Sequence, residues 1–463
     1  MSFFLCRGFS PAVFTPVFFC VMRYINVSTL LLVLFLCAGM LRAEESAPQK
    51  LKLTLAEAKQ IALEQNPSLA QVEAGIQTAM AALESAHSSY LPSVDLSAGV
   101  TRLRDVATRP VRDYDNTTQY DLGLSASYLV FDGFARRFRT LSAELGTETA
   151  TAECEDAKRL LMDSVAYAFY QVLLAQNTME IREQDAAFNQ LLHEDAKKKY
   201  DYGTSKLSEV LNFEYQVKTA EADYVTARNS WRTACVSLGA LLSLQQDNLW
   251  ESIELVAPAE DAGQNGELPA VSEMISYAME HRPDLQNARR NVETAELSLK
   301  EAKAGWAPTV SLFGNYDFTR THSAHFNSHY DRDINFGVKA SWNLFNGGAT
   351  TAAIHQAEAQ LNAAQKALIA TEDTVSSEVR KCHLSLRSAA EILEKENILL
   401  DVATRIRDLV REEYLGGTAT ITRLNEVQTN LTSTSLARTN AWIDLLYAGE
   451  NLSSVTGGYP LAK

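Results

Sequence analysis

The sequence lacks the short motifs by which the commonest enzyme classes are identified. Its 463 residues contain no G-x-x-x-x-G-K-[ST], H-E-x-x-H, G-x-S-x-G or C-x-x-C pattern, and His193-Glu194 has no second histidine at metal-ligand spacing. These absences argue against P-loop, zinc-protease, α/β-hydrolase and dithiol chemistry. We therefore predict that the chain is not an enzyme and that it needs no cofactor.

Cysteine and positive charge are also scarce. Three of the six cysteines lie before residue 44, which leaves the scattered, odd-numbered set Cys154, Cys235 and Cys382. Such a set is not a disulfide framework, so we predict small buried side chains. Asp and Glu number 57 against 42 Lys and Arg, for a net charge of −15. A nucleic-acid partner is not expected, because it would need a basic patch.

Long apolar runs are absent, apart from one short run near the N-terminus. Leu30–Ala38 follows the basic start Met22-Arg23 and precedes a plausible cleavage site at Leu41-Arg42-Ala43. This run is too short to span a bilayer comfortably. We predict that residues 1–43 are a signal peptide and that translation begins at Met22; the alternative is an N-terminal anchor helix.

The remaining sequence repeats itself once. Pro67, Tyr90 and Pro92 correspond to Pro283, Trp306 and Pro308 at an offset of about 216 residues. Phe131-Asp132-Gly133 likewise corresponds to Phe345-Asn346-Gly347. We place the first repeat at 44–268, with a strand pair at about 93–130, a helical hairpin at about 134–243 and a linker at 244–268. The second repeat is placed at 269–463, with a strand pair at about 309–345 and a helical hairpin at about 347–456.

Four segments alternate polar and apolar residues with a period of two: Ser93–Thr101, Gln119–Val130, Thr309–Thr319 and Ile334–Leu344. Their length suits tilted transmembrane strands. An antiparallel sheet over a soluble core would alternate in the same way, but the chain offers no obvious core for these strands. We therefore predict transmembrane strands. Leu122, Leu124, Tyr128, Val338 and Trp342 would face lipid, whereas Ser125 and Lys339 would face the lumen.

Two hairpins cannot close a barrel by themselves. Four strands leave two open edges, whose unpaired backbone groups cannot face lipid, and bacterial barrels begin at about eight strands. The sequence therefore predicts a mixed α/β membrane protein whose β-barrel is shared between subunits.

The rest of the chain has the periodicity of long helices. Leu160, Tyr167, Leu174, Ile181 and Phe188 recur every seven residues, and no Pro or Gly occurs between Ala349 and Tyr414. Helices of about 65 residues would be about 100 Å long. Gly203 and Gly417 permit the left-handed residue that ends such a helix. Each repeat should thus contain a long antiparallel helical hairpin whose tip lies far from the strands.

These paired features together resemble the TolC-like family of outer-membrane efflux proteins, over nearly all of the chain after the leader. The resemblance rests on the starts Asn66-Pro67-Ser68-Leu69 and Arg282-Pro283-Asp284-Leu285, the Phe-Asp-Gly and Phe-Asn-Gly-Gly ends of the strand pairs, and the two Tyr-x-x-Gly-Thr turns. It implies a homotrimer with four strands per subunit and twelve in the barrel, continuous with a coiled-coil periplasmic barrel.

The resemblance also implies partners and a function. The partners would be a periplasmic adaptor (membrane fusion) protein, an inner-membrane transporter of the RND, ABC or MFS type, and outer-membrane lipid. The chain would be the passive outer-membrane duct for multidrug efflux or type I protein secretion. The alternative is a secreted structural coiled-coil protein of the envelope without channel activity.

The same resemblance assigns residues at the hairpin tips. Glu209, Tyr414, Arg423 and Glu426 fall where relatives close the periplasmic aperture, although many relatives have an acid at the position of Arg423. The tip residues that would dock the adaptor are Gly203, Thr204, Leu207, Gly417, Thr418 and Ile421. The alternative is that the four aperture residues are ordinary solvated side chains.

Two loops between the predicted strands contain clusters of basic residues. The spacing of His322, His325 and His329 could hold a metal, but no Cys or fixed carboxylate accompanies them, so we predict no metal site. The first loop contains Arg102, Arg104, Arg109 and Arg112, for which a solvated loop is favoured over contact with anionic surface lipid.

Overall fold

The computed structural model describes residues 51–105, 115–244, 248–258, 269–323 and 329–460. The predicted signal peptide, Arg109, Arg112, His325 and most of the linker 244–268 lie outside these residues. The description below concerns the compact unit Lys52–Lys463.

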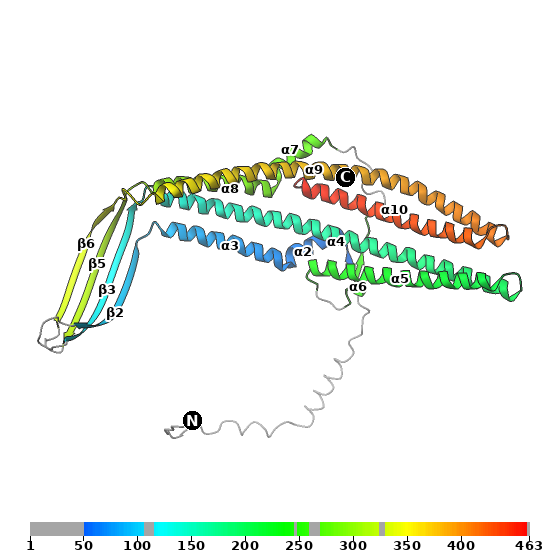
Figure 1. Cartoon of the computed structure of the whole chain (residues 1–463), viewed down its shortest axis with the longest axis horizontal. Coiled ribbons are helices and arrows are strands. Elements are labelled where there is room, and N and C mark those ends of the chain that lie inside the picture. Colours follow the sequence, from blue (N-terminus) through cyan, green and yellow to red (C-terminus); the bar gives the residue numbers. More distant parts are fainter. Residues whose placement is uncertain (1–50, 106–114, 245–247, 259–268, 324–328, 461–463) are drawn as a thin grey trace, which may run out of the picture. The chain divides into compact units, whose positions relative to one another are not determined.

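The four alternating segments form one antiparallel sheet in the order β2-β3-β5-β6 (Figure 1). Its strands are β2 (Ser93–Asp105), β3 (Asp115–Phe131), β5 (Thr309–Ser323) and β6 (His329–Ser341). The β3–β5 pairing joins the two repeats. β2, β3 and β5 extend beyond the predicted segments at their loop ends. β6 ends at Ser341, so Trp342 lies just past the strand and not within it as predicted.

Each face of the sheet has a distinct chemistry. Cα pairing places Leu96, Leu124, Tyr316 and Ile334 in one row across the strands. They are 73%, 45%, 41% and 68% exposed. The adjacent row, on the opposite face, consists of Asp95, Ser125, Asn315 and Asn335. An apolar face this exposed is not the inner face of a soluble core, which favours the membrane interpretation of the alternation.

The helices repeat with equal lengths in the two halves. The first half has α2 (Leu55–Gln65), α3 (Pro67–Ser88), α4 (Ala135–Asp201) and α5 (Leu207–Leu241). The second half has α7 (Val271–His281), α8 (Pro283–Ala304), α9 (Ala349–Leu415) and α10 (Ile421–Val455). Both series run 11, 22, 67 and 35 residues. This agreement confirms the internal duplication. The short elements β1 (Leu51–Leu53), α6 (Leu249–Ser252) and β4 (Ile253–Leu255) complete the described unit.

Local sequence explains where these helices begin. Thr54 and Glu57 form a capping box at α2. Pro67 and Pro283 occupy the first turn of α3 and α8, where proline removes no needed backbone donor. Between β3 and α4, Gly133 has a φ of 69°, and a Cβ there would lie 2.5 Å from the Cβ of Ala307. Only glycine therefore fits this close approach between strand end and helix start.

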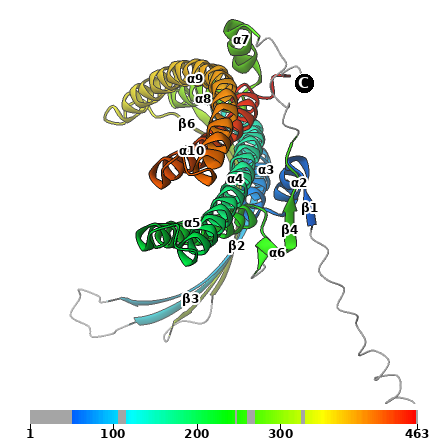
Figure 2. The same ribbon diagram turned by 90° about the vertical axis from the view of Figure 1, so that its right-hand side faces the viewer.

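The helices pack side by side in a fixed order. Near the sheet, α4 packs between α3 and α8, and α8 packs on α9; near the turns, α4 packs between α5 and α10, and α10 packs on α9. Figure 2 looks along these helices and shows α9, α10, α4 and α5 following one another in a curved layer. The two ends of this layer differ, since α3 and α5 lie at one side and α9 at the other.

Two apolar clusters hold the helices together. The larger lies where α2, α7 and the ends of α5 and α10 meet the middle of α4 and α9, and includes Phe169, Met274 and Leu452. The smaller lies near the turns and includes Phe213 and Leu424. The heptad seam predicted along α4 is partly wrong, because Leu160 and Tyr167 are each 50% exposed. No described helix is long and apolar enough to cross a membrane.

Candidate functional site at the helical turns

The turns that join the long helices have the same geometry in both repeats. Gly203 has a φ of 73° and Gly417 a φ of 80°. In each turn the following threonine, Thr204 or Thr418, donates its backbone N–H over 2.9 Å to a carbonyl in the last helical turn, that of Lys199 or Glu413. Its hydroxyl donates to the same carbonyl. The two turns therefore have the same conformation, and both lie at the end of the helices away from the sheet (Figure 1).

The side chains on these tips divide into exposed and packed groups. Thr204, Leu207 and Thr418 are exposed, whereas Ile421 packs partly against the smaller apolar cluster. A Cβ at Gly203 or Gly417 would meet nothing within 4 Å, so their glycine requirement comes from backbone conformation alone.

Tyr414 joins the two hairpins of one chain. It is buried at the end of α9, and its ring lies edge-on to that of Phe213 in α5, with centroids 6.1 Å apart. The ammonium of Lys199 in α4 lies 4.4 Å from the ring centroid. Burial raises the pKa of Tyr414, and nearby Glu209 and Asp195 raise it further. The phenol is therefore neutral at physiological pH and acts as packing at the junction.

The other predicted aperture residues make local contacts within one chain. Ser205 donates its hydroxyl to Glu209 over 2.5 Å. Arg423 pairs with Glu426 over 2.8 Å on the same helix, where both side chains are more than half exposed. An exposed pair of this kind contributes about 0–1 kcal/mol. The structure thus places these groups together at the tips without making them a link between the hairpins.

A buried polar contact, which the sequence did not indicate, does link them. Asp185 of α4 accepts hydrogen bonds from Gln428 Nε2 over 2.7 Å and from Thr432 Oγ1 over 2.9 Å, both on α10. Gln428 and Thr432 are each only 7% exposed. In the sequence, Gln428 and Thr432 are two polar residues four positions apart on the otherwise apolar face of α10 that begins with Leu424. Their role could be recognised only from the structure, which shows that α4 packs against this face.

This contact, the Asp185 node, borders a polar cavity of about 330 Å³ between α4, α5 and α10. Asn189, only 6% exposed, also lines it, and Gln428 Oε1 has no hydrogen-bond partner in the structure. Arg182 and Asp223, which pair over 3.0 Å, form part of the wall within the first hairpin. The seam between the hairpins is therefore polar at the node, between the smaller apolar cluster at the turns and the larger one toward the sheet.

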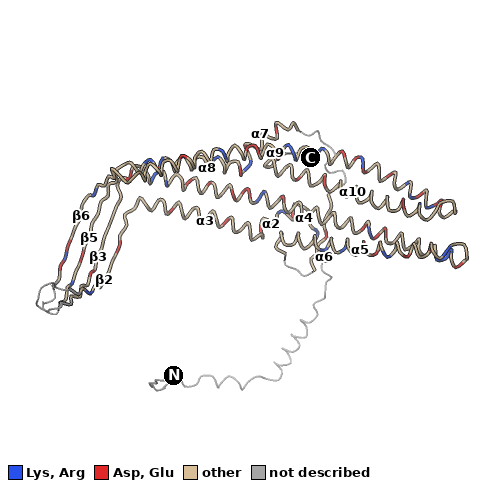
Figure 3. The backbone as a smooth tube through the Cα atoms, viewed as in Figure 1, with Lys and Arg blue, Asp and Glu red and all other residues tan. Residues whose placement is uncertain are grey.

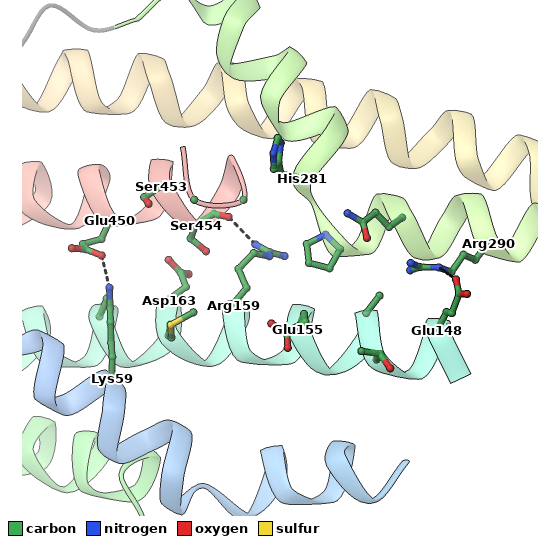
Figure 4. Close-up of a pocket in the computed structure, with 18 residues that line it drawn as sticks. Lys59, Glu148, Glu155, Arg159, Asp163, His281, Arg290, Glu450, Ser453 and Ser454 are labelled. Atoms are coloured by element: carbon green, nitrogen blue, oxygen red, sulfur yellow. Dashed lines mark hydrogen bonds and ion pairs between the residues drawn. The ribbon is translucent and has the colours of Figure 1, made fainter. Parts of the chain in front are cut away.

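A second cavity, of about 690 Å³, lies near the middle of α4 (Figure 4). Lys59 of α2 pairs with Glu450 of α10, and Arg290 of α8 pairs with Glu148 of α4. Burial raises the pKa of Asp163, which also lines the cavity. Lys59 and Arg290 are therefore already paired with carboxylates of the long hairpins. These ion pairs connect α2 and α8 to the hairpins, so we interpret this cavity as structural.

The sheet presents the predicted lipid-facing residues on one exposed face. Leu122, Leu124, Tyr128 and Val338 share this face and are exposed. Trp342, just past β6, is exposed as well, and its indole donates over 3.0 Å to the carbonyl of Trp306. Arg102 and His322 lie on this face near the loops. Among the described residues, no group of three or more His, Cys, Asp or Glu could hold a metal ion.

Comparison with known proteins identifies related chains. The profile of the family described as outer membrane efflux protein matches residues 58–243 and 274–458, one segment in each repeat. Outer membrane protein TolC of Vibrio cholerae is 25% identical over 411 residues, covering 87% of this chain and 90% of the relative. Alkaline protease secretion protein AprF of Pseudomonas aeruginosa is 23% identical over 311 residues, covering 66% and 62%.

Solved structures share the fold. The outer membrane channel CmeC of Campylobacter jejuni superposes with a TM-score of 0.76 at 16% identity, covering 87% of this chain and 85% of that one. The outer membrane protein VceC of Vibrio cholerae gives a TM-score of 0.74 at 20% identity, covering 87% and 96%.

Proposed function

Because the chain belongs to the outer membrane efflux protein family, we propose that it is the outer-membrane duct of an export assembly. The observation that carries this proposal is that the subunit has two open lateral edges together with an exposed apolar face on its sheet. β2 ends the sheet on the side where α3 and α5 end the helical layer, and β6 ends it on the side of α9. The exposed apolar face of the same sheet has no partner within the described part of the chain.

The two open sides explain why the duct would be a ring of copies. Two-fold pairing of β2 with β2 of a second copy would leave both β6 edges open, so it could not close a barrel. Head-to-tail contacts between unlike edges close into a ring when the rotation per subunit fits. Three copies would bring twelve strands into one barrel, which is above the minimum of about eight for bacterial barrels. In the same ring, α9 of one copy would pack on α3 and α5 of the next.

The exposed apolar residues of the helices agree with this packing. On α9, Leu399, Val402 and Leu409 are exposed, and on α5, Leu211 and Tyr215 are exposed. In a closed ring these two surfaces would face each other, and their burial would add to the strand pairing. The helical layer would then continue the barrel as a tunnel through the periplasm.

The tips would form the periplasmic aperture of this tunnel. Glu209, Arg423 and Glu426 lie on the tips with their charges available to a neighbouring copy, and Leu207 and Thr418 are exposed where a periplasmic adaptor would dock. An inner-membrane transporter would deliver the cargo through that adaptor. The family is described by efflux, while one relative is a protease secretion protein, so we infer that the transporter and the adaptor would select the cargo.

The test is a measurement of assembly and conductance on the same preparation. The full chain is extracted from outer membranes in detergent, cross-linked with a short amine-reactive reagent, and inserted into planar bilayers. We expect cross-linking to stop at the trimer and the trimer to conduct ions in discrete steps. A folded, membrane-inserted monomer would overturn the shared barrel. A stable trimer that never conducts would support a structural envelope protein instead.

A further inference from the structure

Two arginines and two aromatic residues alternate at the loop end of β5 and β6. The backbone register pairs Phe318 with Arg332 and Arg320 with Tyr330. The guanidinium of Arg320 lies 5.2 Å from the centroid of the Tyr330 ring, and that of Arg332 lies 5.9 Å from the centroid of Phe318. The two rings are themselves 5.9 Å apart. Each guanidinium is thus positioned by an aromatic ring.

In the described part of the chain, neither guanidinium forms an ion pair with a carboxylate. Among the described residues, no hydrogen bond or ion pair involves Arg320 or Arg332. The nearest acids along these strands, Asp317, Asp331 and Asp333, are odd-numbered and therefore lie on the opposite face of the sheet. A guanidinium has five N–H donors, and an aromatic ring beside it accepts no conventional hydrogen bond, so these donors stay available. The pair therefore presents two sets of donors and two positive charges to whatever lies outside the apolar face.

The position of the two arginines along β5 and β6 indicates their depth relative to the membrane. On the same face of β5, the residues before Arg320 are Val310, Leu312, Gly314, Tyr316 and Phe318. Nine residues of strand span roughly 30 Å, which matches the apolar band of an outer-membrane strand, about 25 Å tall when tilted. Phe318 and Arg332 then form the last row of this band, at the level of the aromatic girdle, and Arg320 and Tyr330 form the next row toward the loops.

The direction across the membrane follows from the helices. Both long helices, α4 and α9, begin at the end of the sheet opposite Arg320 and Arg332, and Figure 1 shows them leaving the sheet from that end. If the helices extend into the periplasm, as the proposed function requires, these arginines lie in the headgroup layer of the outer leaflet. Figure 3 shows charges of both signs dispersed along the hairpins, so the paired arginines are not part of a general basic surface.

We propose that Arg320 and Arg332 bind a phosphate group on the headgroup of an outer-leaflet lipid, with Phe318 against the first part of its acyl region and Tyr330 beside the headgroup. A phosphate offers several acceptor oxygens and more than one negative charge, and arginine forms paired, charge-assisted hydrogen bonds to it. Arg102 of β2 lies on the same face one row closer to the loops. In a closed ring, β2 of the next copy would bring an Arg102 to the same side as Arg332. This inference rests on the proposed function.

The test compares two lipids that differ only in phosphate. The full-length protein in detergent is titrated with a bisphosphorylated diglucosamine lipid and with its dephosphorylated form, and bound lipid is counted by native mass spectrometry. The variants are Arg320→Gln, Arg332→Gln and the double substitution. The matched control is Lys339→Gln, which removes one positive charge from the opposite face of the same sheet. Inorganic phosphate is added as a competitor in a separate arm.

We expect the phosphorylated lipid to bind at least about tenfold more tightly than the dephosphorylated one, and each arginine variant to lose about tenfold in affinity for it. The double variant should no longer distinguish the two lipids, whereas Lys339→Gln should behave as the unmodified protein. Equal binding of both lipids by the unmodified protein would overturn the proposal. Full displacement by inorganic phosphate at equal concentration would indicate a simple anion site and would also overturn it.

Flotation with vesicles separates this inference from the function on which it rests. If the protein floats with vesicles of either lipid but shows no phosphate preference, the site is wrong and the membrane placement stands. If it floats with neither, the membrane placement fails and the site fails with it. Circular dichroism and cross-linking of the two single variants show whether any loss of lipid binding reflects misfolding.

Discussion

Asn66 and Arg282 make the same contact in the two repeats. Asn66 Nδ2 donates over 2.9 Å to the carbonyl of Leu241, the last residue of α5, and Arg282 Nη1 donates over 3.2 Å to that of Val455, the last residue of α10. Each side chain is buried where a short helix meets a longer one that begins with proline. Both repeats thus tie the end of the returning helix to the same junction, although the residue types differ.

The second junction also contains charges. Arg282 donates to Glu378 Oε2 over 2.6 Å and to both oxygens of Asp284. We expect Arg282→Gln to lower the free energy of unfolding by about 2–4 kcal/mol, because it leaves two carboxylates without their cation and removes charged hydrogen bonds. Thermal unfolding of the detergent-purified protein measures this. The control is Arg387→Gln, which breaks an exposed pair with Glu391 and should cost less than about 1 kcal/mol. An equal loss of unfolding free energy in the two variants would contradict the claim that the buried contacts of Arg282 stabilise the fold more than an exposed ion pair does.

The same junction should make the stability of the fold depend on pH. Burial raises the pKa of Asp284, but the hydrogen bonds and charge of Arg282 outweigh burial and place it below its ordinary value of 3.8. A lowered carboxyl pKa stabilises the fold above the unfolded-state value and loses that contribution as the pH falls through the folded-state value. The unfolding temperature should therefore fall as the pH is lowered from above 3.8 to below it. In Arg282→Gln this part of the pH dependence should disappear, and its persistence would assign the effect to other carboxylates.

The faces of the sheet predict opposite outcomes at neighbouring positions. Leu124→Arg should lower stability in the membrane by about 2–4 kcal/mol, because it places a charge on the face that we predict to contact hydrocarbon. Ser125→Arg should be tolerated, since Ser125 shares a row with Asp95 and Asn315 on the polar face. The yield of heat-resistant trimer in outer-membrane fractions measures both. If Ser125→Arg prevents assembly and Leu124→Arg does not, the faces are assigned the wrong way round.

The sequence was informative where a periodic pattern determines the structure. The alternation in Gln119–Val130 and Thr309–Thr319 identified two strands and the face each presents, because side chains in a strand point to alternate sides. The repeat predicted matching helices, and those of the two halves have equal lengths. Gly203 and Gly417 marked the two turns because their positive φ angles favour glycine.

The sequence was less informative where a contact depends on two distant segments. The seven-residue recurrence of Leu160 and Tyr167 predicted a packed seam, yet the buried side chains of α4 include Val165 and Phe169. A long helix that contacts different partners along its length need not keep one seam. The Asp185 node was missed for the same reason, since no local pattern pairs α4 with residues about 240 positions later. Trp342 was placed within a strand because Trp342 and Leu344 continue the alternation of apolar and polar residues past the end of β6.

The charges at the tips predict a change in conductance. In the described part of the chain, the hydrogen bond of Glu209 and the ion pair of Arg423 each lie within one segment, so their remaining hydrogen-bonding capacity is available to neighbouring copies. Each such link is weak, about 0–1 kcal/mol, but three-fold repetition would make them act together. We expect the double variant Glu209→Gln/Arg423→Gln to raise single-channel conductance in planar bilayers without lowering the trimer yield. Loss of trimer would instead mean that these residues stabilise assembly.

The Asp185 node predicts a second change in conductance, with a different origin. Asp185→Leu leaves the amide of Gln428 and the hydroxyl of Thr432 without their acceptor in a buried seam, at a cost of about 1–3 kcal/mol for each group. The larger apolar cluster around Phe169 and Met274 is not altered, so the hairpins should loosen at the node and weaken the smaller cluster of Phe213 and Leu424 beside it, while the rest of the unit stays folded. We expect higher single-channel conductance with an unchanged trimer yield.

A matched variant distinguishes hairpin separation from a general loosening of this region. Asp223 lines the same cavity, but its ion pair with Arg182 lies within the first hairpin, between α4 and α5. Asp223→Leu should therefore lower the stability of that hairpin slightly and leave the conductance unchanged, because the contact between the hairpins persists. If Asp223→Leu raises conductance as much as Asp185→Leu does, the effect comes from disturbing the cavity and not from breaking the node. If neither variant changes conductance, the hairpins are held by the apolar cluster and by Tyr414 on Phe213, and the polar seam does not control the aperture.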